Sequence, residues 1–99
     1  MSDRIYTLNE IKNIVNPIAE EFKVDSVYLF GSYARGEAGE TSDLDFRIDK
    51  GQVRGLKFAR LCNALADAFD KNVDVVTTSS LTDSFKDTIL PEEVLLYAK

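Results

Sequence analysis

Segments with the apolar spacing of a helix alternate along this chain with segments typical of strands. Helical spacing runs over 8–22, where Thr7 and Glu10 have the form of a capping box, and again over 56–69. Pro17 falls inside the first of these stretches and is expected to kink or split the helix. The alternation restricts the chain to folds in which helices pack against a sheet.

The remaining elements follow the same logic and complete the prediction of the fold. A last helix is expected after a cap at Ser80 or Thr82 and is stopped by Pro91. Strands are expected at 23–30, 43–49 and 73–77, and residues 94–97 add a last strand or a packed tail. The 99 residues therefore predict one domain, 1–99, of the α/β class, with a small mixed β-sheet and helices packed on it.

Composition removes several chemistries and several kinds of partner. The sequence has no histidine, so neither a catalytic triad nor an imidazole metal ligand is available. A net charge of −5, from 17 acidic and 12 basic residues, argues against direct binding to nucleic acid. The single Cys62 cannot form an internal disulfide, and no signal peptide or membrane span is visible, so a cytoplasmic protein without membrane contact is expected.

Two short motifs give the most specific chemical signal. Gly31 and Ser32 end one predicted strand, and Asp43 and Asp45 open the next. Two residues apart on a strand, these carboxylates project from one face and repel each other unless a cation lies between them. Such hard oxygen ligands suit Mg²⁺, which shares its coordination shell with phosphates. Asp74 is the candidate third acid, because burial in its apolar strand would require a metal or a hydrogen-bonding partner.

The glycine–serine pair has the properties of a phosphate-binding turn. Gly31 has no side chain, so a phosphate can approach its backbone closely. Ser32 offers a hydroxyl and an amide, and a short helix beginning there would add partial positive charge. Taken singly, the pair is an ordinary turn and the acids are an ordinary solvated strand face. Together they indicate a site for phosphoryl transfer.

The sequences GSYARG at 31–36 and SDLD at 42–45 closely resemble the motif of the DNA polymerase β-like nucleotidyltransferase superfamily. Within it, the chain looks like the minimal nucleotidyltransferase (MNT) group. The resemblance implies a polymerase β-like nucleotidyltransferase fold, with Asp43 and Asp45 as catalytic metal ligands. It also implies that Asp74 is the third carboxylate, which helps to bind Mg²⁺ and to activate the acceptor hydroxyl.

By the same resemblance, the glycine–serine pair would hold the triphosphate. Arg35 either touches a phosphate or anchors the loop, and the sequence leaves both roles open. Arg47 lies on the strand face of the acids, where the family more usually has an apolar residue. It is expected to form an ion pair with Asp49 or Asp74, or else to contact phosphate.

Members of the minimal group are often antitoxins encoded beside HEPN-domain RNase toxins. For this chain the resemblance implies transfer of AMP from ATP to a tyrosine of such a toxin, which agrees with a chain too short for an acceptor-binding domain of its own. The alternative is a non-catalytic antitoxin that neutralises its partner by complex formation. Transfer to a small molecule is the least favoured, since relatives of that kind have additional domains.

Overall fold

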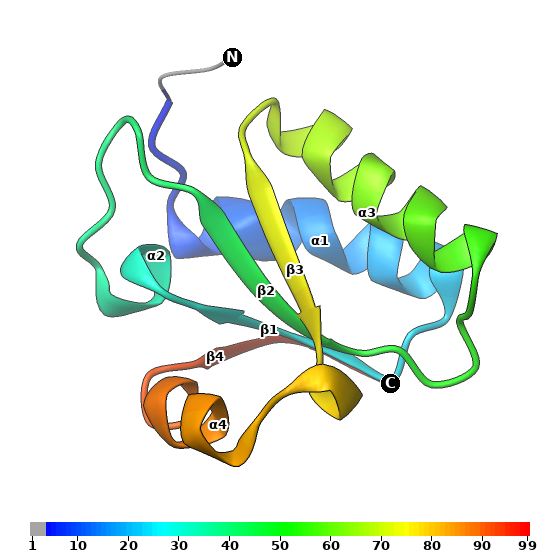
Figure 1. Ribbon diagram of the computed structural model, residues 1–99. Helices are drawn as coiled ribbons and strands as arrows, with labels where there is room; N and C mark the ends of the chain where they lie inside the picture. The colour runs from blue at the N-terminus through cyan, green and yellow to red at the C-terminus, as the bar shows by residue number, and fades with distance from the viewer. Residues whose placement is uncertain (1–3) are drawn as a thin grey trace.

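A four-stranded sheet organises residues 4–99, which a computed structural model describes. The strand order is β3-β2-β1-β4 (Figure 1). β2 runs antiparallel to β1 and parallel to β3, and β4 runs antiparallel to β1. The predicted mixed sheet is therefore confirmed, with strands at Ser26–Phe30 (β1), Leu44–Asp49 (β2), Val73–Thr77 (β3) and Val94–Ala98 (β4).

The helices are divided between the two faces of the sheet. Figure 1 shows α1 and α3 together on one side and α4 on the opposite side, with the short α2 at the end of β1. Because α3 connects β2 to β3, these two strands can run parallel as neighbours. The helical segments are Leu8–Phe22 (α1), Ser32–Arg35 (α2), Leu56–Phe69 (α3), Thr78–Ser80 (η1, a 3-10 turn) and Asp83–Ile89 (α4).

The core lies between the sheet and the pair α1 and α3. The predicted alternation of β2 is confirmed, because Leu44, Phe46 and Ile48 are all fully buried. They pack in one cluster with apolar residues of both helices and of β1 and β4. The opposite face of β2 carries Asp45, Arg47 and Asp49, so one strand separates the core from the polar face of the sheet.

The first helix has the predicted boundaries, whereas the strand that follows it begins later than predicted. Thr7 and Glu10 form the predicted capping box, and the helix continues through Pro17 without a break. Lys23, however, has φ 59° and closes the helix with its amide, which donates to the carbonyl oxygens of Ala19 and Glu20. The expected start of the strand at 23 is therefore wrong, and β1 begins at Ser26.

In the last third of the chain, the structure decides which residue caps α4 and whether the final residues form a strand. Thr82 caps α4 by accepting a hydrogen bond from the amide of Phe85, whereas Ser80 belongs to the preceding 3-10 turn. Residues 94–98 form a paired strand and not a packed tail. No helix in the described part of the chain is long and apolar enough to cross a membrane.

Candidate active site

Asp45 and Asp74 lie side by side on the polar face of the sheet. Asp45 is on β2 and Asp74 is on β3, and the two residues are direct partners in the parallel register. Paired residues on neighbouring strands project to the same face, so the two carboxyl groups lie on one face of the sheet. On its other side Asp45 is paired with Phe30 of β1. The sheet thus places one predicted metal ligand between an aromatic ring and a second acid.

The surroundings of Asp45 disfavour its negative charge. Partial burial, then the charges of Asp74 and Asp43, and then a side-chain hydrogen bond with Asp74 raise the pKa of Asp45 to about 6. The positive charge of Arg35 opposes this shift. Two acids held this close are in the electrostatic situation that a cation relieves.

Asp43 and Asp74, the other two predicted ligands, are more exposed than Asp45. Asp43 is exposed and lies just before the first residue of β2, so it acts on Asp45 through its charge. Asp74 is also exposed, because β3 is an edge strand, so the cost of burying a carboxylate does not arise there. Within residues 4–99 no three acidic, thiol or imidazole groups are gathered closely enough to hold a metal ion by themselves.

The turn between β1 and α2 closes the site from the other side. Gly31 has φ 77° and ψ −157°, a conformation open essentially to glycine alone. A Cβ on this residue would overlap Oδ2 of Asp45 and lie 3.1 Å from its Cγ. The predicted short helix does begin at Ser32. The glycine therefore lets the phosphate-binding turn proposed from the sequence approach the acid pair directly.

Arg35, at the end of α2, is held by two glutamates. Its Nε donates to Glu37 at 3.2 Å, and its Nη1 donates to both carboxylate oxygens of Glu92 at 3.2 and 3.1 Å. The same Glu92 Oε1 accepts the backbone amide of Gly31 at 3.2 Å. The turn, the arginine and the segment before β4 are thereby joined through one carboxylate.

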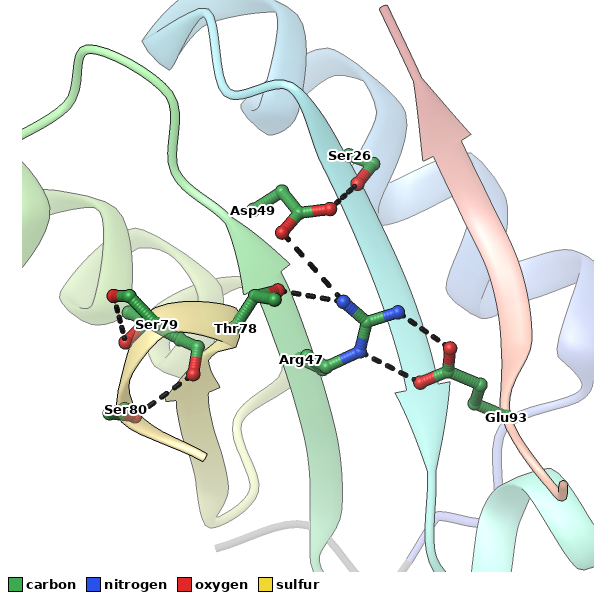
Figure 2. Close-up of polar contacts among 8 residues, drawn as sticks. Ser26, Arg47, Asp49, Thr78, Ser79, Ser80 and Glu93 are labelled. Atoms are coloured by element: carbon green, nitrogen blue, oxygen red, sulfur yellow. Dashed lines mark hydrogen bonds and ion pairs between the residues drawn. The ribbon is translucent and has the colours of Figure 1, made fainter. Parts of the chain in front are cut away.

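Arg47 is buried on the polar face, in a network that Figure 2 shows. Its Nε and Nη2 donate to Glu93 at 2.9 and 2.6 Å, and its Nη1 donates to Thr78 at 2.7 Å. Asp49 lies 3.7 Å from Nη1, and the guanidinium carbon is 4.1 Å from the ring centre of Tyr28. Of the predicted roles, the ion pair is the one observed, and Glu93 is its main partner.

Glu92 and Glu93 are the residues of this region that the sequence does not reveal. Their partners, Arg35 and Arg47, precede them by 57 and 46 residues. No local spacing rule connects groups so far apart. The one available signal is that two adjacent acids directly precede an apolar last strand, where burial would require cationic partners.

Comparison with known proteins assigns the chain to one family. The model described as "Polymerase beta, Nucleotidyltransferase" matches residues 9–99. Protein adenylyltransferase MntA of Thermococcus cleftensis is 39% identical over 93 residues, which cover 89% of this chain and 94% of that protein. The family resemblance of the two motifs is thereby confirmed.

Solved structures share the fold. A crystal structure of a toxin–antitoxin with AMP-PNP aligns with a TM-score of 0.74 and 24% identity, over 89% of this chain and 73% of that chain. A structure of a tri-AMPylated Shewanella oneidensis HEPN toxin in complex with MNT antitoxin aligns with a TM-score of 0.67 and 22% identity, over 90% and 71%. At these identities the likeness establishes the architecture.

Proposed function

Because the chain belongs to the Polymerase beta nucleotidyltransferase family, we propose that it is a protein adenylyltransferase that acts as an antitoxin. In this proposal it transfers AMP from Mg-ATP to a tyrosine hydroxyl of a partner HEPN RNase toxin. The proposed reaction takes place in the cytoplasm, which suits the free thiol of Cys62.

The pairing of Asp45 with Asp74 against the Gly31 turn is the observation that carries the proposal. Partial burial and neighbouring negative charge hold the pKa of Asp45 near 6, which is costly for a carboxylate with only a structural role. The donor set consists of oxygens alone, as Mg²⁺ prefers. We assign Asp43, Asp45 and Asp74 as the residues that would hold it, with nucleotide phosphates completing the shell.

Each residue then has a defined task. The amide and hydroxyl of Ser32 and the open backbone at Gly31 bind the triphosphate, and Arg35 adds a positive charge at its edge. Asp74 is exposed, so it can accept the proton of an incoming hydroxyl. When bound, Mg²⁺ supplies the charge that neutralises the phosphates and lowers the pKa of that hydroxyl.

The bond changes follow from this arrangement. The acceptor oxygen attacks the α-phosphorus and forms the new ester bond, while the bond from that phosphorus to the bridging oxygen breaks. Pyrophosphate leaves with the electron pair, and the hydroxyl proton passes to Asp74. Most of the catalysis comes from positioning and electrostatics, because the protein forms no covalent bond with the nucleotide.

The relatives support the choice of donor and partner. The Thermococcus cleftensis relative is named a protein adenylyltransferase, one fold neighbour was solved with AMP-PNP, and another is an antitoxin bound to an AMPylated HEPN toxin. In this proposal the partner protein supplies the acceptor tyrosine.

The test is a labelling assay with α-labelled ATP, Mg²⁺ and the proposed HEPN partner protein. We expect label on the partner, and its loss with the Asp43→Asn/Asp45→Asn variant or when a partner tyrosine is replaced by phenylalanine. Label on no protein, despite a stable complex, would contradict the enzymatic proposal and favour an antitoxin that acts by binding alone.

A further inference from the structure

The carboxylate of Glu92 connects two groups that the proposed function assigns to the nucleotide. It accepts the backbone amide of Gly31 at 3.2 Å and the Nη1 of Arg35 at 3.2 and 3.1 Å. Oxygen Oε1 takes part in both contacts. A single side chain from the segment before β4 therefore fixes the arginine relative to the turn.

The segment that presents Glu92 is itself anchored. The amides of Glu92 and Glu93 both donate to the carbonyl of Ile89 at 3.1 Å, so the chain turns tightly after α4. The next side chain, Glu93, is buried in its ion pair with Arg47. The backbone at Glu92 is thus held in place, and the Glu92 side chain is only 22% exposed.

The contacts leave part of the Arg35 guanidinium available. Nε is directed to Glu37 and Nη1 to Glu92, while Nη2 makes no hydrogen bond to any residue of 4–99. Glu92 links Arg35 to the amide of Gly31, and a Cβ on Gly31 would meet Asp45, so the guanidinium is held on the same side as the acid pair. An arginine held at two nitrogens loses little further freedom when it binds a phosphate oxygen with the third.

We propose that Glu92 is a positioning residue of the nucleotide site, which ties the Gly31 turn to Arg35 and so presents both to the triphosphate. The inference rests on the proposed function, since it names how that same site is held in place. Glu92 itself touches neither the nucleotide nor the acceptor.

Binding of Mg-AMP-PNP, measured by calorimetry, tests this role in the full chain. We expect Glu92→Ala to weaken binding about tenfold, because a charge-assisted contact that orders the site is lost, with the number of sites per chain unchanged. Glu92→Gln keeps an acceptor oxygen for both donors and is expected to restore affinity to within about threefold of the parent. A merely structural role would reduce the number of competent sites and leave the affinity of the remainder unchanged.

The matched control is Glu37→Ala, which removes the other glutamate on Arg35 but leaves the link to Gly31. It is expected to change the dissociation constant less than twofold. Unchanged affinity in Glu92→Ala would overturn the inference, and tighter binding would show instead that Glu92 competes with phosphate. If the parent protein itself fails to bind Mg-AMP-PNP, the proposed function falls and this inference with it.

Discussion

At the scale of single residues, Asp45 makes the stability of the protein depend on pH. Its pKa in the folded protein is about 6, against an ordinary value near 3.8. Between these two pH values the folded state binds the proton more readily than the unfolded state. The contribution of Asp45 to the free energy of unfolding therefore falls as pH rises from about 4 to 6 and stays lower above that window.

Replacing this carboxylate is expected to stabilise the metal-free protein. Asp45→Asn should raise the free energy of unfolding at pH 7.5 by about 1 kcal/mol, a figure reduced for solvent screening of a half-buried group. The gain should disappear near pH 4, where the parent is protonated too. Urea denaturation in EDTA at both pH values measures it. Asp67→Asn, on the exposed side of α3, is the control, and an equal gain in that variant would contradict the assignment.

Gly31 is the second residue whose substitution has an effect on stability that its local geometry predicts. Gly31→Ala introduces a side chain at φ 77° and drives its Cβ into Asp45, so we expect a loss of about 3 kcal/mol and of nucleotide binding. Gly36→Ala shares the positive φ of 72° but meets no atom within 4 Å, and should lose only about 1 kcal/mol. Equal losses in thermal unfolding would show that the backbone conformation, and not the contact with Asp45, is responsible.

At the level of elements, β2 has two different stabilising faces. One face is wholly apolar and packs against α1 and α3, while the other carries the buried Arg47. The arginine pairs with Glu93 and donates to Thr78, the first residue of η1, so one side chain links three parts of the fold (Figure 2). Such a network makes the fold sensitive to the loss of any single partner.

Removing the Glu93 side chain should therefore strongly lower the free energy of unfolding. Glu93→Ala leaves the Arg47 guanidinium buried without its main partner, and we expect a loss of about 3 kcal/mol in urea denaturation. The double variant Arg47→Met/Glu93→Leu removes both charges and should recover most of that loss. A double variant as unstable as Glu93→Ala would mean that packing, not the unpaired charge, dominates at this position.

The elements that the sequence predicted well are those with long local patterns. The spacing of α3, the capping box of α1 and the alternation of β2 each depend on neighbours within a few residues. The β1 boundary was missed because Lys23 adopts a left-handed conformation that local pattern does not encode. The partners Glu92 and Glu93 were missed because the contacts depend on β4 lying beside β1, a property of the assembled sheet.

At the level of the whole molecule, the sheet brings together groups from three strands. Gly31 follows β1, Asp45 is on β2 and Asp74 is on β3, and the register aligns the two acids. The motif in the sequence identified these residues, whereas the exposure of Asp74 depends on the place of β3 at the sheet edge. A ligand that engages all three strands should stabilise the fold as a unit.

Mg-ATP is accordingly expected to stabilise the protein against unfolding. At a concentration 100 times its dissociation constant, the gain is about 2.7 kcal/mol, visible as a rise in melting temperature by calorimetry. ATP with EDTA should give a much smaller rise, and Asp45→Asn/Asp74→Asn should respond to neither. An equal rise with and without the metal chelator would contradict the role assigned to the acids.

The long separation between Arg35 and Glu92 also has a consequence in time. The two residues are 57 positions apart, so a ribosome adding 5–20 residues per second completes the second roughly 3–11 seconds after the first. Throughout that interval a nascent chain has its glycine–serine turn but lacks the carboxylate that orients it. If Glu92 acts as proposed, the full affinity for nucleotide is gained only after that interval, and a chain released before Glu92 is added would bind ATP more weakly.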